Sequence, residues 1–268
     1  MARGLDHIVH AVRDLDVAAA LYRDLGFTVG ARNKHPWGTH NHIVQFPGFF
    51  IELLTLAEPD KLDGGVFSQE FGAYNRDFAA RHEGLSMLVL ESKDSSGDAA
   101  AYNAAGIAAS DSVRFEREGK RPDGTPVHVA FSLAFARDQA ASEARFFTCQ
   151  QHYPENFWNP DFQTHANGAT GIGDIVMVAN EPARHRDFLL AYTGAAAVAP
   201  LGDGFRVALP RGAIELLTPN GYTVRYDLSP PDTSNGPRLA AMRFAGPWPR
   251  RRRLVGALGA GLIFGQGD

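Results

Sequence analysis

Hydrophobic and polar residues follow one another along this chain in a pattern that predicts strands and helices in a recurring order. Residues 5–12 form an apolar run that is typical of a strand. A helix is predicted after it, with Asp14 or Asp16 as the N-cap and Leu25 near its end. Gly26 suits the position that follows a helix, because glycine adopts positive φ at little cost.

Extended segments follow this helix, and the same order then recurs. The first series closes with extended segments at residues 27–31, 41–46 and 49–54. Pro47 and Gly48 predict a hairpin turn between the last two. A second series has a strand at residues 85–90, a helix that starts near Ser96, and Gly106 after the helix. Its extended segments are residues 112–116, 127–135 and 145–150, with a turn at residues 122–124.

Two further series are predicted in the last third of the chain. The third has a strand at residues 174–178, a helix from Pro182 to Tyr192, and Gly194 after it. It closes with a hairpin of residues 205–209 and 213–217 around a turn at residues 210–212. The fourth is short, with a strand at residues 238–244, a helix near residues 250–258 and a strand at residues 262–264.

A repeated pentapeptide indicates that these series are copies of one module. IELLT occurs at residues 51–55 and again at 214–218, in matching context. The expected fold is therefore α+β, built from tandem β-α-β-β-β modules in two halves. We expect residues 1–160 to hold modules 5–56 and 83–152, and residues 168–268 to hold modules 171–218 and 237–268. A doubly wound parallel sheet is disfavoured, because several strands follow each helix and no GxGxxG or P-loop sequence follows a strand.

Composition narrows the function classes. A net charge of −4 argues against nucleic acid as a partner, and without a dinucleotide or P-loop motif no nucleotide cofactor is expected. The single cysteine, Cys149, excludes an intramolecular disulfide and a cysteine-based zinc site, and suits a reducing cytosol. The longest apolar stretch, residues 254–264, is about half the length of a membrane span. With charges throughout residues 1–16, no signal peptide is expected, and the prediction is a cytoplasmic protein without membrane contact.

Two strings in the first module carry a family resemblance. LDHIVHAVRDLDVAAALYRDLGF (5–27) resembles the opening module of the vicinal-oxygen-chelate superfamily. HPWGTHNHIVQFPGFFIELL (35–54) is similar, more narrowly, to its glyoxalase-like domain proteins. The resemblance implies that paired modules curl into half-open mixed-sheet barrels. It also implies that a divalent metal is held by the first and last strands of each module.

Carried over onto this sequence, the resemblance places His7 and Glu52 at the metal-ligand positions of the first module. An imidazole with a carboxylate suits Zn²⁺, Ni²⁺, Mn²⁺ or Fe²⁺. In the second module the matching positions are read as Ser86 and Thr148, so the nearest polar candidates for metal ligands are Gln150 and His152. In the third module Asp174 and Glu215 match without a histidine, and no second metal site is expected.

Alternatives remain open for each candidate. His7 and Glu52 either bind a metal or form a buried hydrogen bond that shapes a pocket, and Glu52 is also a candidate general base. A polar and aromatic cluster is interpreted as the substrate-binding rim: His35, Trp37, Thr39, Asn41 and His42. Phe157 and Trp158 either close the pocket mouth or belong to a linker that packs over the barrel. Cys149 is interpreted as a small core residue.

The function that follows is a metal-dependent lyase or isomerase acting on a small oxygen-rich substrate. Oxygenation is disfavoured, because a dioxygenase needs two histidines and a carboxylate, and Ser86 takes the place of one histidine. The alternative is a non-catalytic small-molecule or antibiotic binder without a metal. The superfamily also pairs modules across chains, which leaves a homodimer open.

Overall fold

Fifteen strands form one mixed, open sheet in the computed structural model, which describes residues 1–120, 124–248 and 253–265. The strands of the first half are β1 (Leu5–Ala11), β2 (Asn33–Lys34), β3 (Thr39–Phe46), β4 (Phe49–Leu56), β5 (Gly84–Glu91), β6 (Val113–Lys120), β7 (Pro126–Ala136) and β8 (Arg145–Gln151). Those of the second half are β9 (Gly171–Val178), β10 (Ala199–Leu201), β11 (Gly204–Ala208), β12 (Ala213–Leu217), β13 (Arg238–Ala245), β14 (Arg253–Ala257) and β15 (Ala260–Phe264).

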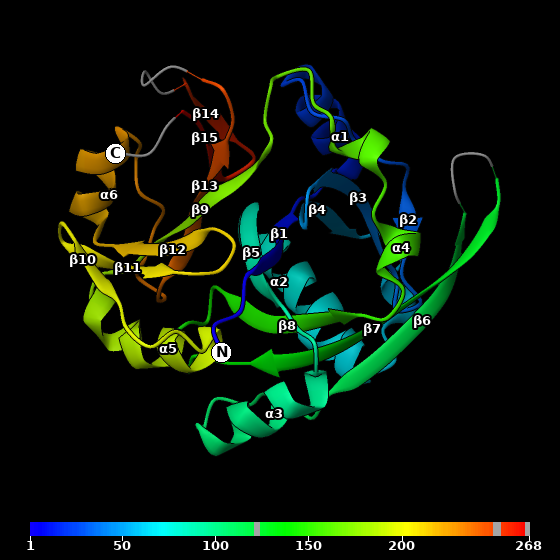
Figure 1. The fold of residues 1–268 in the computed structure, drawn as a ribbon, viewed down its shortest axis with the longest axis horizontal. Helices are drawn as coiled ribbons and strands as arrows, with labels where there is room; N and C mark the ends of the chain where they lie inside the picture. The colour runs from blue at the N-terminus through cyan, green and yellow to red at the C-terminus, as the bar shows by residue number, and fades with distance from the viewer. Residues whose placement is uncertain (121–123, 249–252, 266–268) are drawn as a thin grey trace.

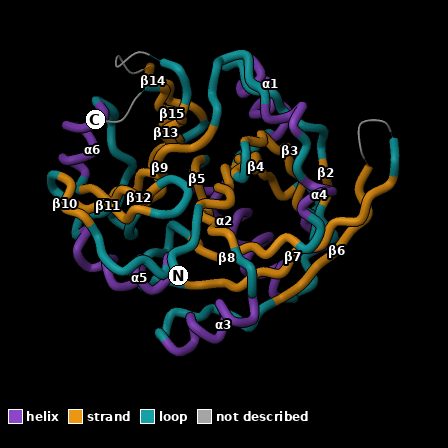
Figure 2. Tube along the Cα trace, viewed as in Figure 1, coloured by secondary structure: helices purple, strands orange, loops and turns teal. Residues whose placement is uncertain are grey.

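The helices are short and lie mainly outside the strands. They are α1 (Leu15–Asp24), α2 (Tyr74–Arg81), α3 (Ser95–Ala104), α4 (Pro154–Phe157), α5 (Arg186–Thr193) and α6 (Pro219–Tyr226). A π-helix precedes α2 at Phe67–Ala73, and 3₁₀ turns occur at Pro59–Lys61, Pro160–Gln163 and Pro182–His185. Figure 2 shows α1, α3, α5 and α6 at the periphery of the strands. Among the described residues, no helix has the length and apolar character needed to span a membrane.

The same strand pairing occurs in both halves (Figure 1). In the first half β1 and β5 are antiparallel, and each has a parallel neighbour, β4 and β8 respectively. In the second half β9 and β13 are antiparallel, with β12 and β15 as their parallel neighbours. The β-α-β-β-β prediction is therefore confirmed in its pairing, and each half forms a half-open barrel that does not close.

Local sequence accounts for the predicted helix boundaries. The Asp14 side chain accepts hydrogen bonds from the backbone N–H groups of Asp16 and Val17, each at 3.0 Å, which caps α1. Asp94 caps α3 in the same way through the N–H of Gly97. After α5, Gly194 has φ +70°, a conformation that favours glycine.

Several elements differ from prediction. Residues 27–31 are not a strand, and the short strand β2 comes after them. The helix predicted near residues 250–258 is wrong, because β14 is paired with β15 as a hairpin from Arg253 onward. This pairing satisfies the backbone hydrogen-bonding groups of the apolar segment. It also leaves β15 buried beside β13. The π-helix and α2 were not predicted, and most of the turn predicted at residues 122–124 lies outside the described residues.

Helix α5 joins the two halves through a buried tyrosine. The Tyr192 hydroxyl lies 2.7 Å from the carbonyl oxygen of Leu88 on β5 and 2.9 Å from that of Phe147 on β8. Residues of both halves share the largest apolar cluster, and β13 also pairs with β5 where Leu239 faces Leu85. A second cluster fills the inside of the first barrel, and the candidate site lies there.

Candidate active site

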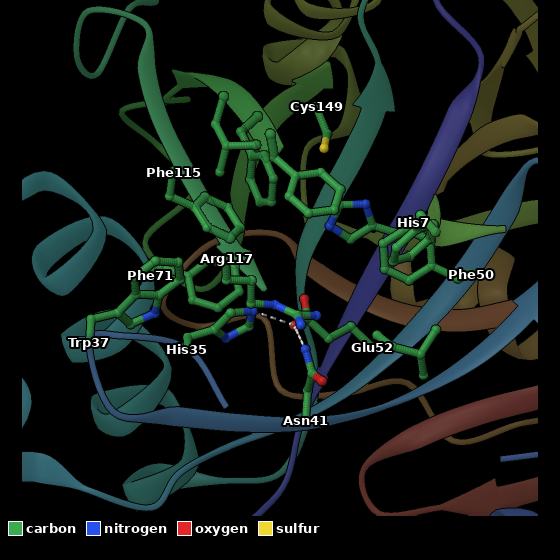
Figure 3. Close-up of a pocket in the computed structure, with 15 residues that line it drawn as sticks. His7, His35, Trp37, Asn41, Phe50, Glu52, Phe71, Phe115, Arg117 and Cys149 are labelled. Atoms are coloured by element: carbon green, nitrogen blue, oxygen red, sulfur yellow. Dashed lines mark hydrogen bonds and ion pairs between the residues drawn. The ribbon is translucent and has the colours of Figure 1, made fainter. Parts of the chain in front are cut away.

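A cavity of about 60 Å³ opens on the concave face of the first half, with room for a few water molecules or a small substrate. Figure 3 shows its polar side chains converging from several strands. Its lining residues are His7, His35, Trp37, Asn41, Ile43, Phe50, Glu52, Phe71, Phe115, Arg117, Phe131, Leu133, Phe147, Cys149 and Phe157. The walls are therefore mostly aromatic, with a few polar groups facing inward.

Glu52 is the buried carboxylate of this cavity, with 4% of its surface exposed. Alternation along β4 places Phe50 and Glu52 on the cavity side. The Asn41 side-chain amide donates to Glu52 Oε1 at 2.5 Å, and His35 Nε2 lies 3.9 Å from the same oxygen. Burial raises the pKa of Glu52, against the opposing effects of His7, Asn41 and Arg117. A carboxylate in this state can accept a proton from a bound molecule.

His35 is held rigidly and in its neutral form. Its Nδ1 lies 2.9 Å from Thr39 Oγ1, and its ring stacks on Trp37 with the ring centroids 4.7 Å apart. Burial, together with the charge of Arg117, lowers the pKa of His35 to about 3. The tight connection that carries His35 and Trp37 depends on Gly38, where φ is +93°.

Arg117 on β6 is a functional candidate that the sequence reasoning missed. Its side chain lines the cavity, and burial lowers its pKa while the charge of Glu52 opposes that effect. Period-two alternation along β6 was the signal that could have found it, because Phe115 and Arg117 share the cavity face and Arg114 and Glu116 are exposed. Arg117 supplies the cavity with a positive charge near Glu52.

His7 on β1 also lines the cavity, next to Asp6 and Cys149. Its Nδ1 is 2.5 Å from Asp6 Oδ1, and its ring stacks on Phe50 with centroids 4.2 Å apart. A bulge in the β1–β5 pairing at Asp6 brings the side chains of these adjacent residues together. Burial, with the charges of Asp6 and Glu52, raises the pKa of the Cys149 thiol.

The structure brings six of the predicted site residues together at the cavity: His7, His35, Trp37, Asn41, Glu52 and Phe157. Thr39 supports it through His35. Trp158 lies beside Phe50, 5.9 Å between ring centroids, and lines the neighbouring cleft with Phe157.

Three other predicted residues are engaged elsewhere. His42 Nδ1 bonds the carbonyl oxygen of Gly30 at 2.7 Å. Gln150 bonds the backbone of Lys93 and Ser95, and His152 Nε2 lies 2.8 Å from Ser132 Oγ. None of the three lines the cavity, although Cys149, read from sequence as a core residue, does.

The strand register corrects the equivalences assumed for the second module. The helix caps Asp14 and Asp94 are 80 positions apart (94 − 14), and adding 80 to His7 gives Met87, not Ser86. Likewise Val9 pairs with Glu52, and its counterpart Val89 pairs with Phe147, not Thr148. Ser86 instead donates to Asn75 Oδ1 at 2.6 Å.

This register tests the metal that the fold implies. The four barrel positions hold His7, Glu52, Met87 and Phe147, of which the last two carry no ligand that suits a hard or borderline divalent metal. Within the described residues, His7, His35 and Glu52 do not form a set whose ligand atoms all lie within 4.8 Å of one another. The residues at these four positions therefore do not fit the expected four-ligand metal site.

In the second half, the two positions that match His7 and Glu52 both hold carboxylates, and arginine side chains neutralise their charge. Val176 pairs with Glu215 just as Val9 pairs with Glu52, and Asp174 takes the place of His7. Both carboxylates are 1% exposed. Asp174 is paired with Arg206 and Arg243, and Glu215 with Arg225. The Tyr226 hydroxyl also donates to Glu215.

Solved structures of similar fold were found at low sequence identity. A hypothetical protein from Staphylococcus aureus has a TM-score of 0.71 at 14% identity, covering 98% of this chain and 99% of its own. A triple mutant of 4-hydroxymandelate synthase from Streptomyces coelicolor has a TM-score of 0.55 at 11% identity, covering 91% and 71%. The Mn(II)-bound glyoxalase from Novosphingobium aromaticivorans has a TM-score of 0.53 at 12% identity, covering 98% and 82%.

Sequence comparison gives the family. No curated protein matches the chain. The sequence profile of the family described as "Glyoxalase-like domain" matches residues 5–193, which include every strand of the first half and every residue that lines the cavity. The chain therefore belongs to the glyoxalase-like domain family of the vicinal-oxygen-chelate superfamily.

Proposed function

We propose that this protein is a lyase or isomerase that uses Glu52 as a general base on a small oxygen-rich substrate. The substrate would carry a carbonyl group next to a C–H bond and a negatively charged oxygen. The observation that supports this proposal most directly is the burial of Glu52 in an aromatic cavity beside the cationic Arg117.

Glu52 has a free oxygen for the reaction. Oε1 accepts the hydrogen bond of Asn41, whereas Oε2 accepts none from the residues that the structure describes. Because burial disfavours the charged carboxylate, Glu52 gains from accepting a proton at a pH where an exposed glutamate would not. In the proposed step the C–H bond breaks, the proton moves to Glu52, and the electron pair moves onto the substrate carbonyl oxygen.

The neighbouring groups suit the charge that this step creates. The Arg117 guanidinium can hold the carbonyl oxygen as it becomes negative, and this interaction is strong because aromatic side chains exclude water. Neutral His35 can donate or accept a hydrogen bond without adding a charge. Trp37 Nε1 is a buried donor with no protein partner among the described residues, so it is available to a substrate oxygen. Return of the proton to the neighbouring carbon would give isomerisation, and loss of a leaving group would give a lyase.

The test is hydrogen exchange catalysed by the purified protein in D₂O. A panel of small 2-oxo acids, 2-hydroxy acids and hydroxyketones would be followed by NMR for deuterium entering the carbon next to the carbonyl. We expect exchange with at least one compound class, and a loss of about 10²- to 10⁴-fold in Glu52→Gln. Glu58→Gln, a change at a more exposed carboxylate that follows β4 and pairs with His40, is the matched control and should keep the activity. A compound that binds equally well to wild type and Glu52→Gln without any exchange would contradict catalysis and favour the non-catalytic binder.

A further inference from the structure

A second group of polar side chains lies at the wall of the same cavity, where His7 and Cys149 line it. It consists of Asp6, His7 and Cys149, which are all buried. One carboxylate oxygen, one imidazole nitrogen and the thiol sulfur lie within 4.8 Å of one another. We propose that these three residues form a binding site for a thiophilic divalent cation, with Zn²⁺ as the best match.

The three side chains are fixed before any ligand arrives. His7 is held between Phe50, stacked at 4.2 Å, and the edge of Phe147, with ring centroids 5.4 Å apart. Asp6 is held by His7 at Oδ1 and by the Gln151 amide, which donates to Oδ2 at 3.1 Å. Ligands that keep their places without the metal lose little conformational entropy when the metal binds.

The charges of this site favour a cation over a reactive thiolate. Cys149, His7 and Asp6 could also be compared with the nucleophile, base and orienting carboxylate of a thiol enzyme. However, two buried carboxylates are already present, Asp6 in the cluster and Glu52 in the cavity, and a thiolate would add another negative charge. A divalent cation would compensate such charges, so the observations favour metal binding over nucleophilic catalysis.

A separate observation beside the cluster points to a missing ligand. Gln151 Oε1 is buried and has no hydrogen-bond partner among the described residues, while the same amide holds Asp6. A buried acceptor without a partner costs roughly 1–3 kcal/mol, and a water molecule on a bound cation would satisfy it. This oxygen is therefore an acceptor available to a water molecule on a cation held beside Asp6.

The donor types select the metal. A thiolate sulfur, an imidazole nitrogen and a carboxylate oxygen form a borderline-soft set that suits Zn²⁺ and not Mg²⁺ or Ca²⁺. Three protein ligands would leave the fourth tetrahedral position open toward the cavity that His7 and Cys149 line. This set shares His7 with the site predicted from sequence but replaces Glu52, Gln150 and His152.

The test is a Co²⁺ titration of the untagged, metal-free protein, followed by absorption spectroscopy. Because the chain has one cysteine, a thiolate-to-cobalt charge-transfer band can come only from Cys149. We expect one equivalent of Co²⁺ to produce this band and Zn²⁺ to abolish it by displacement. Cys149→Ser should lose the band, and Asp6→Asn and His7→Gln should each weaken Co²⁺ binding by at least about 10- to 100-fold.

Glu52→Gln is the matched control, since it changes a carboxylate of the same cavity outside the cluster and should keep the band. Absence of Co²⁺ and Zn²⁺ binding, or Co²⁺ binding without the thiolate band, would overturn the proposal. The wild-type spectrum alone decides between these outcomes if a variant fails to fold. This inference can fail separately from the proposed general base. Deuterium exchange tests the role of Glu52, whereas the cobalt band tests metal binding by Cys149.

Discussion

The side-chain amide of Asn41 donates a hydrogen bond to Glu52 Oε1, with an Nδ2–Oε1 distance of 2.5 Å. The two residues are diagonal neighbours on β3 and β4, since Asn41 pairs with Leu54 and Glu52 with Ile43, and both side chains line the cavity. Because the amide nitrogen of Asn41 can only donate a hydrogen bond, this bond stabilises the charged form of Glu52. The bond therefore limits how far burial raises the pKa of the base.

Asn41→Ala should raise the pKa of Glu52 further. A base acts only when it has lost its proton, so the acid limb of the pH–rate profile for deuterium exchange should move to higher pH. A shift of about one unit corresponds to the loss of one hydrogen bond to a charged group. Asn103→Ala, at an exposed position on α3, should leave the profile in place. An unchanged acid limb in Asn41→Ala would show that Glu52 does not set it.

His35 should make the protein less stable in mild acid. Its pKa is about 3 in the folded protein and about 6.5 when unfolded, so the unfolded chain binds a proton first as the pH falls. Stability from this residue is full above pH 6.5 and declines between pH 6.5 and pH 3, by about 2 kcal/mol at pH 5. Urea unfolding at pH 7 and pH 5 should show a smaller difference for His35→Gln than for wild type. His128→Gln, on β7, is the control, and equal pH dependence in wild type and His35→Gln would contradict the assignment.

Arg117 should determine the preference for negatively charged ligands. Arg117→Gln is expected to weaken binding of a small carboxylate about 10-fold or more, because a buried charge pair is poorly screened. The affinity for a neutral analogue of the same shape should change much less. Arg114→Gln is a matched control on the same strand, since Arg114 is exposed and paired with Glu116. Calorimetric titration of wild type and the two variants, each with both ligands, would show whether the effect depends on ligand charge.

Gly38 should be intolerant of a side chain. At φ +93°, a Cβ on this residue would lie 2.1 Å from the carbonyl oxygen of Glu58. Gly64 also has positive φ, at +81°, but a Cβ there meets nothing within 4 Å. Gly64→Ala should thus cost about 1–2 kcal/mol of backbone strain, and Gly38→Ala clearly more, with loss of ligand binding at His35 and Trp37. Similar unfolding free energies for the two variants would argue against this close approach.

The arginine network of the second half should stabilise the fold. Arg243→Met leaves Asp174 buried with one of its two partners removed, and a loss of about 3–5 kcal/mol is expected for breaking a buried pair. Arg184→Met removes an exposed pair with Glu181 and should change stability by less than about 1 kcal/mol. Chemical denaturation of both variants compares the two cases, and equal small effects would mean that the Asp174 pair is compensated by solvent.

The sequence alone predicts those helices and turns whose ends carry strong local signals. Asp14 and Gly26 delimit α1, and Pro47-Gly48 gives the turn between β3 and β4. The prediction is wrong for a segment without such signals, residues 253–257, where pairing with β15 outweighs local helix preference.

The site was only partly predictable, because its members meet through strand register and not through sequence spacing. His7, Asn41 and Glu52 were found from the family resemblance and from alternation. Cys149 is 142 positions from His7 (149 − 7), and no local pattern brings them together. The equivalences at Ser86 and Thr148 were one residue out, and in a strand such a shift moves a side chain to the opposite face.

The contacts of Tyr192 tie the folding of the two halves into one thermodynamic unit. Its hydroxyl meets the backbone of β5 and β8 from a helix of the second half, and β13 continues the sheet from β5. Neither half can lose its structure without exposing the apolar residues that both share. A ligand in the cavity of the first half, at a hundred times its Kd, would therefore add about 2.7 kcal/mol to the unfolding of the whole chain. The second half is therefore stabilised by a ligand bound in a cavity that only residues of the first half line.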